Sequence, residues 1–109
     1  MADQQPNLAS IGRGGDAAAV RFYLADFRPS TASVRMVLVS PTRSLPRIVV
    51  YDVAGRAVRT ISDGGSVTGT REYVWDLRNG GGAAVHSGIY FARLTGVGRP
   101  NVVRMAVVR

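Results

Sequence analysis

The sequence predicts an all-β fold, a sandwich of about seven antiparallel strands in one domain. Short runs rich in β-branched and aromatic residues recur at near-regular spacing from Val20 onward. Clusters of Gly, Pro and Asn separate these runs, as expected for turns between strands. No stretch keeps the period of about 3.6 residues that an amphipathic helix needs, so folds with crossover helices are disfavoured.

The chain divides into a short leading segment and one domain. Residues 1–19 are polar, Gly-rich and without a sustained hydrophobic period, which predicts a linker or flexible arm. Residues 20–109 carry all the strand-like runs and form the predicted sandwich. The start of the sequence lacks the basic and apolar regions of a signal peptide, so we expect the chain to be a piece of a longer protein.

Strands are predicted wherever a run of four to eight residues combines β-propensity with flanking turn residues. The predicted ranges are 20–25, 33–39, 47–53, 57–62, 70–77, 88–95 and 101–108. Ala54-Gly55 separates two of these runs and predicts a tight hairpin, because Gly accepts the positive φ that such a turn requires. Pro41 and Pro46 are expected to bracket a loop, since proline cannot donate a hydrogen bond to a strand ladder.

Alternation along the strands predicts the core. Tyr73 and Trp75 fall on one face of their strand, and Tyr90, Ala92 and Leu94 fall on one face of theirs. In the run 47–53 the inward set is predicted to be Val49, Tyr51 and Val53. Further core positions are expected at Val34, Met36, Leu38, Val103, Met105 and Val107. The residues predicted to define the fold are Tyr51, Gly55, Tyr73, Trp75, Gly88, Tyr90 and Leu94.

The composition excludes several kinds of chemistry. The chain has no cysteine and no lysine, so thiolate nucleophiles, thiolate metal sites, Schiff bases and lysine isopeptide crosslinks are all excluded. No apolar run approaches the roughly 18 residues of a membrane span. The formal net charge is +7, and every one of the 14 basic residues is Arg. Codon usage explains an all-Arg content; selection for binding anions in a bidentate geometry is the alternative explanation.

No catalytic, cofactor or metal site is predicted. The single histidine, His86, can be combined on paper with Ser87 and Asp76 into a nucleophilic triad, but adjacent loop residues seldom align a hydroxyl with an imidazole. One histidine without cysteines cannot build an ordinary zinc site. The seven carboxylates are scattered, and Asp52 is expected to accept hydrogen bonds from turn amides beside Ala54-Gly55. The chain is therefore not expected to be an enzyme.

The arginines are the most distinctive predicted surface feature. Five arginines within predicted strands are selected as candidates, because alternation should turn most of them outward and align two or three across one sheet. These candidates for an anion-binding surface are Arg35, Arg59, Arg71, Arg93 and Arg104. An anionic polysaccharide is one possible ligand, whereas no motif for specific nucleic acid is present. A solvated face without a ligand is the simpler interpretation.

Several segments together resemble a known family. The stretch 50–61 (VYDVAGRAVRTI), then Tyr73-Val-Trp-Asp76, then 87–94 (SGIYFARL) and 103–109 (VRMAVVR) are similar to the immunoglobulin-like repeat of the flagellar hook-capping protein. They are also similar to the C-terminal sorting domains of type IX secretion cargo. The match runs from about Phe22 to Arg109. The resemblance implies an immunoglobulin-like β-sandwich that ends a secreted bacterial protein.

Three functions are considered for a module of this kind. The first is a non-catalytic module for secretion sorting or cell-surface attachment, whose partner is a secretion or anchoring apparatus and whose location is outside a Gram-negative-type cell. The second is a structural module that joins other copies of itself through edge strands or the arm 1–19. The third is a carbohydrate-binding module, which requires exposed aromatic side chains.

Overall fold

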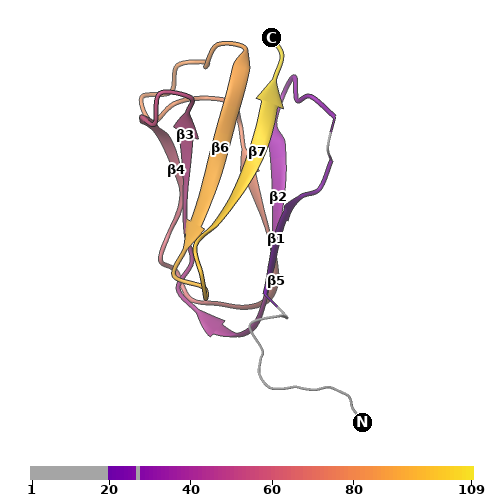
Figure 1. The fold of residues 1–109 in the computed structure, drawn as a ribbon, viewed down its shortest axis with the longest axis vertical. Helices are drawn as coiled ribbons and strands as arrows, with labels where there is room; N and C mark the ends of the chain where they lie inside the picture. Colours follow the sequence, from indigo (N-terminus) through magenta and orange to yellow (C-terminus); the bar gives the residue numbers. More distant parts are fainter. Residues whose placement is uncertain (1–19, 27) are drawn as a thin grey trace.

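Seven strands form two antiparallel sheets that face each other (Figure 1). The computed structural model describes residues 20–26 and 28–109, so the predicted arm 1–19 lies outside the described residues. The strands are β1 (Arg21–Leu24), β2 (Val34–Ser44), β3 (Arg47–Asp52), β4 (Ala57–Asp63), β5 (Val67–Trp75), β6 (Gly88–Thr95) and β7 (Asn101–Val107). One sheet has the order β1-β2-β5 and the other β4-β3-β6-β7. This is the immunoglobulin-like sandwich that the sequence predicts, and the described residues contain no helix.

The prediction of a loop between Pro41 and Pro46 is wrong over most of its length. Strand β2 continues through Pro41 to Ser44 and pairs with β5 on both sides of a register shift between Ser40 and Ser44. A proline is tolerated there because the irregular pairing leaves its missing N–H without a ladder partner. Inside the irregularity the Ser40 hydroxyl lies 2.7 Å from the Thr42 carbonyl oxygen and donates to it.

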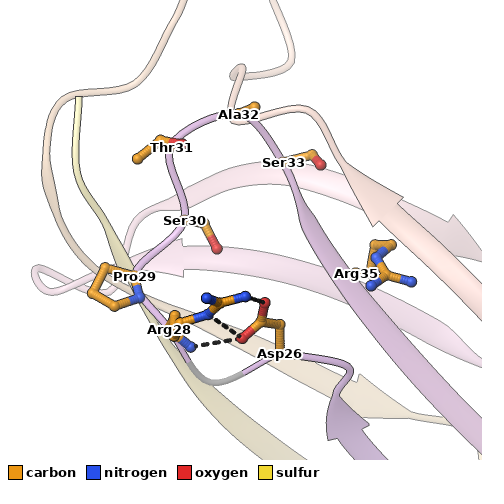
Figure 2. A pocket seen from close by; sticks show the side chains of 8 residues that line it. All are labelled: Asp26, Arg28, Pro29, Ser30, Thr31, Ala32, Ser33 and Arg35. Carbon is orange, nitrogen blue, oxygen red and sulfur yellow. Dashed lines mark hydrogen bonds and ion pairs between the residues drawn. The ribbon is translucent and has the colours of Figure 1, made fainter.

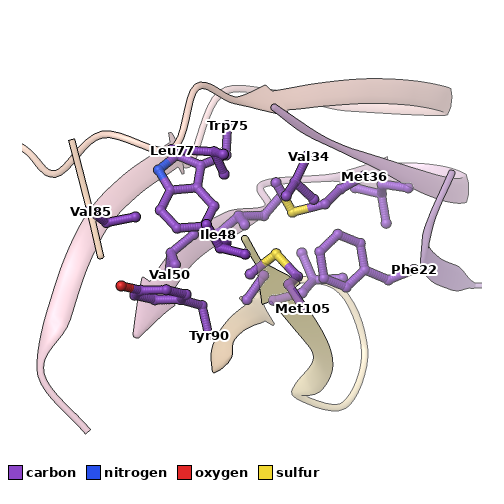
Figure 3. Close-up of a cluster of buried hydrophobic side chains, with 14 of the residues drawn as sticks. Phe22, Val34, Met36, Ile48, Val50, Trp75, Leu77, Val85, Tyr90 and Met105 are labelled. Atoms are coloured by element: carbon purple, nitrogen blue, oxygen red, sulfur yellow. The ribbon is translucent and has the colours of Figure 1, made fainter. Parts of the chain in front are cut away.

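The core lies between the sheets and is built by the inward face of each strand (Figure 3). Trp75 is fully buried and meets Tyr90 edge to face, with ring centroids 5.3 Å apart. The indole Nε1 donates a 2.9 Å hydrogen bond to the Arg78 carbonyl, so the polar atom of this side chain is satisfied inside the fold. Leu94 is also fully buried, whereas Tyr73 packs against the cluster while only partly buried.

Strand β3 presents the opposite face from the one predicted. Ile48 and Val50 are fully buried in the core. Of the predicted set, Val49 is buried although it lies on the outer side opposite Arg93, Tyr51 is half-buried on that side, and Val53 lies exposed in the following turn. The pairing with β6 fixes this register, because Val50 lies opposite the inward-facing Ala92. Residues 48–50 are all apolar, so alternation cannot show which set points inward, and a one-residue shift exchanges the two faces. Tyr51 is therefore not a core residue.

The hairpin between β3 and β4 confirms the predicted turn. Gly55 has a φ of +83°, and its N–H donates to the Asp52 carbonyl at 3.0 Å. The Asp52 carboxylate accepts hydrogen bonds from the N–H groups of Ala54 and Arg56, each 3.0 Å long. The N–H of Arg56, with support from its guanidinium and from Ala54, holds the pKa of Asp52 below its usual value.

The loop after β1 joins the two sheets along one side. Ser30 forms an isolated parallel bridge with Val107, its N–H donates to Ala106, and its carbonyl accepts from Val108, both at 2.9 Å. Strand β1 thereby lies beside β7 of the other sheet (Figure 1). On the opposite side, β4 and β5 have no such bridge among the described residues, and side chains span the gap instead.

Candidate interaction surface

The five candidate arginines do not form one surface. Arg35 and Arg71 lie in the β1-β2-β5 sheet, whereas Arg59, Arg93 and Arg104 lie in the other sheet. The structure also gives them different partners. The predicted alignment therefore holds for only one pair of them.

Three of the five arginines are engaged within the domain. Arg35 pairs with Glu72 of the neighbouring strand at 3.2 Å. The guanidinium of Arg71 lies 5.6 Å from the Tyr73 ring centroid, within the range of a cation–π contact. Arg59 pairs with Asp76 at 2.8 Å and donates to the Arg78 carbonyl. These arginines serve the fold, and their charges are already balanced or stacked.

Arg59 spans the side of the sandwich where β4 and β5 approach each other. Because Asp76 follows β5 directly, this ion pair links the edge strands of the two sheets. Partial desolvation raises the pKa of the Asp76 carboxyl, but the Arg78 N–H and the Arg59 guanidinium outweigh it, and the net pKa is lowered. Asp76 is thus a structural anion and not a catalytic acid.

Arg93 and Arg104 are the two that remain. Both lie on the outer face of the β4-β3-β6-β7 sheet, because the alternate residues Ala92, Leu94 and Met105 are buried. Phe91 pairs with Arg104 and Arg93 pairs with Val102, so the arginines are diagonal neighbours. Their Cα atoms are then about 7–8 Å apart. Within residues 20–26 and 28–109, neither makes an ion pair or a side-chain hydrogen bond.

Apolar side chains surround these two arginines. One cross-strand row contains Tyr51, Phe91 and Arg104, and the next contains Val49, Arg93 and Val102. We call this surface the apolar–basic face and define it by eight residues on this side of the sheet, Val49, Tyr51, Ile89, Phe91, Arg93, Val102, Arg104 and Ala106. Val49 is only 7% exposed, and the other seven are half-buried or exposed. No acidic residue belongs to it. Sequence reasoning missed Tyr51 as a surface residue, although the alternation of Ile89, Phe91 and Arg93 was a usable signal for β6.

The outer face of the other sheet carries one ion pair and one stacked arginine. The Arg35–Glu72 pair crosses from β2 to β5. On β1, the Arg21 guanidinium lies 5.3 Å from the ring centroid of Tyr23, which is 39% exposed. On β5, Val74 lies opposite Arg35 and is exposed as well. This face therefore pairs one of its arginines with an acid and stacks the other on a tyrosine.

His86 does not assemble a triad. It is exposed and lines a shallow pocket with Asp52, Arg56 and Tyr90, not with Asp76. The Tyr90 hydroxyl donates to the His86 backbone carbonyl at 2.7 Å, and burial raises the pKa of this tyrosine. The Asp52 carboxylate in the same pocket is already bonded to turn amides and to Arg56. No free base and nucleophile meet here.

The loop between β1 and β2 lines a second pocket (Figure 2). Its acid, Asp26, accepts hydrogen bonds from the N–H and the guanidinium of Arg28, and this pairing lowers the pKa of Asp26. The nearby Arg35 is held by Glu72. In the described part of the chain, no three His, Cys, Asp or Glu side chains gather as metal ligands. Nor do these residues form a helix that could cross a bilayer.

The two-sheet arrangement of seven antiparallel strands defines an immunoglobulin-like domain. The family model described as FlgD Ig-like domain matches residues 24–98. The chain belongs to the FlgD Ig-like domain family. A search of curated proteins gave no match.

Two solved structures share the fold. Dimeric latent PorU from Porphyromonas gingivalis aligns with 82% of this chain at 20% identity and a TM-score of 0.61. PorZ from the same bacterium, described as an essential surface component of the type-IX secretion system, aligns with 87% at 20% identity and a TM-score of 0.53. This chain covers 9% of the PorU chain and 12% of the PorZ chain. Immunoglobulin-like domains of this form thus occur as small parts of much larger proteins.

Proposed function

We propose that the chain is a non-catalytic module of a secreted bacterial protein and acts in secretion sorting or cell-surface attachment. The observation that carries the proposal is that the carboxylates of the domain are bonded within it, whereas one outer face is not. The carboxylates of Asp26, Asp52 and Asp76 are occupied by turns and ion pairs, whereas the apolar–basic face is left for contacts with other molecules. Such a distribution suits a protein that binds and does not transform.

The similar proteins support this proposal. The chain belongs to the FlgD Ig-like domain family, and PorU and PorZ, which share its fold, both come from Porphyromonas gingivalis. PorZ is described as a surface component of the type-IX secretion system. For this chain we therefore propose a partner in a secretion or anchoring apparatus and a location outside the cell.

A reporter experiment tests the proposal. Residues 1–109 are fused behind a periplasm-directed fluorescent protein in a bacterium that has a type-IX apparatus. We expect the reporter to reach the cell surface or the medium. The control carries Trp75→Ala, which destabilises the core and so tests whether the intact fold is required. A reporter that stays in the periplasm with the intact module would refute sorting and attachment.

Self-assembly is a second candidate, favoured by one feature of the fold. Strand β5, over Val67–Trp75, pairs only with β2 and leaves its other edge open within the described residues. An open edge can accept a strand from another copy. Static light scattering across a wide concentration range decides the matter: a growing mass that Thr70→Lys on this exposed edge abolishes would support assembly, and a constant monomer mass would remove it.

A further inference from the structure

The apolar–basic face combines features that rarely occur together on a free surface. Its two guanidinium groups lack acidic partners in the described part of the chain, and its centre consists of Tyr51, Phe91 and aliphatic side chains. Protein interfaces are enriched in Tyr, Phe and Arg and depleted in Asp, Glu and Lys at their centres. The face has this composition, whereas on the opposite outer face Arg35 pairs with Glu72 and Arg21 stacks on Tyr23.

The charge pattern selects the chemistry of the partner. Arg93 and Arg104 stand on Cα atoms about 7–8 Å apart, so each can receive one carboxylate from an extended or sheet-like segment, in which alternate side chains repeat at a similar distance. Charge-assisted pairs of this kind gain strength when apolar contacts exclude water around them. The partner must therefore present acidic side chains next to apolar ones.

A second copy of the chain does not fit this requirement. Joining two such faces would bring four arginines together, and none of the eight face residues is an acid that could offset their repulsion. The formal net charge of +7 adds to the repulsion at long range.

A polysaccharide fits less well than a polypeptide. Stacking of a sugar needs an open aromatic ring, but Tyr51 and Phe91 are half-buried among Val49, Ile89 and Ala106. Branched aliphatic side chains complement apolar side chains better than they complement hydroxyl groups.

We propose that the apolar–basic face binds an acidic, apolar-bearing polypeptide surface of the sorting or anchoring apparatus, with Arg93 and Arg104 pairing to its carboxylates. This inference rests on the proposed function and adds the contact site and the partner's chemistry. The three strands β3, β6 and β7 span about 10 Å, and residues 102–106 span about 14 Å. So small a patch favours reversible docking and not a permanent complex.

The absence of lysine makes a site-specific test possible. In the full-length protein that contains this chain, Arg104→Lys places the only side-chain amine of residues 1–109 on the face. A carbodiimide added to exporting cells joins an amine only to a carboxylate in direct contact. The matched control, Arg21→Lys, places the amine on the opposite outer face. Equal melting temperatures show that both variants fold.

Mass spectrometry of the peptide that contains position 104 gives the outcome. We expect this peptide to be joined to Asp or Glu of another polypeptide, with a crosslink yield several-fold above that of the control. The yield should fall in about 0.5 M salt, which screens exposed charges. No excess over the control, a bond to a sugar acid, a bond to a second copy, or a bond within the same polypeptide would each overturn the inference. Export of the Lys variants is scored separately, so normal export without the crosslink refutes the docking site and leaves the proposed function standing.

Discussion

The arginines on the two outer faces of this sandwich have different surroundings. Both sheets carry arginines on strands, but the β1-β2-β5 sheet pairs Arg35 with Glu72 and stacks Arg21 on Tyr23. The β4-β3-β6-β7 sheet pairs Arg47 with Asp63 and Arg59 with Asp76, but in the described part of the chain it leaves Arg93 and Arg104 among apolar side chains. A charge that is balanced inside a domain contributes to folding, whereas a charge left unbalanced is available to a partner. The comparison therefore separates arginines that have partners within the domain from the two that we propose bind a partner.

The difference originates in where the acids fall. Glu72 sits within β5, where alternation turns it outward beside β2. Strands β6 and β7 contain no Asp or Glu. Their arginines consequently have no cross-strand partner of opposite charge.

The largest expected effect comes from the core that both faces share. Trp75→Ala should lower the free energy of unfolding by about 3–5 kcal/mol, because the fully buried indole leaves a cavity under both sheets. Urea unfolding measures the loss. Val74→Ala, on the outer face one residue earlier, should change it by less than about 0.5 kcal/mol. Similar losses for the two variants would contradict the assignment of inner and outer faces.

A second substitution should lower stability through the β6–β7 hairpin, which carries Arg93 and Arg104. Gly96 follows β6 with a φ of +84°, and an added Cβ would lie 2.2 Å from the Leu45 carbonyl oxygen. Gly96→Ala should therefore cost about 2–4 kcal/mol, from the backbone conformation and the displaced segment together. Gly98→Ala, at a φ of +60° in open space, should cost only about 1–2 kcal/mol. Thermal unfolding of the two variants at one pH checks the order.

The arginines themselves should separate by face. A double-mutant cycle of Arg35→Gln and Glu72→Gln should give a coupling energy of about 0.2–1 kcal/mol, typical of an exposed ion pair. The double variant Arg93→Gln/Arg104→Gln should stay within about 0.5 kcal/mol of the parent, because it removes no described contact. A larger loss in that variant would show that these arginines stabilise the fold.

The smallest effect is a pH dependence at the β3–β4 turn. The folded pKa of Asp52 lies below the unfolded value of 3.8, so its contribution to stability is present above pH 3.8 and is lost as the pH falls through the folded pKa. Asp52→Asn should therefore melt lower than the parent at pH 6. The difference in melting temperature should shrink below pH 3.8, and a constant difference down to pH 2 would exclude this linkage.

Most of the fold could be predicted because turns and strand propensity are local. Gly55 marked the hairpin, and Trp75, Tyr90 and Leu94 marked the core. The inward face of β3 could not be predicted, because the run Ile48-Val49-Val50 is apolar on both faces and only the pairing with β6 fixes the register. The loop predicted from Pro41 was wrong for a related reason. The irregular pairing of β2 with β5 that accommodates this proline cannot be recognised from the local sequence.

The candidate surface could be predicted only in part, because it also depends on how the strands pair. The sequence placed the five candidate arginines on strands, but which of them meet an acid depends on the order of strands in each sheet. Tyr51 joined the candidate site through the corrected register of β3, and Phe91 through its pairing with both Tyr51 and Arg104.

The most direct measurement compares export when each outer face loses two arginines. Reporter fusions of residues 1–109 carry either Arg93→Gln/Arg104→Gln or Arg21→Gln/Arg35→Gln, which change the net charge equally. We predict that the first pair lowers the fraction of reporter at the cell surface or in the medium, and that the second pair leaves it near the parent value. Equal fractions for the two variants would contradict a functional difference between the faces.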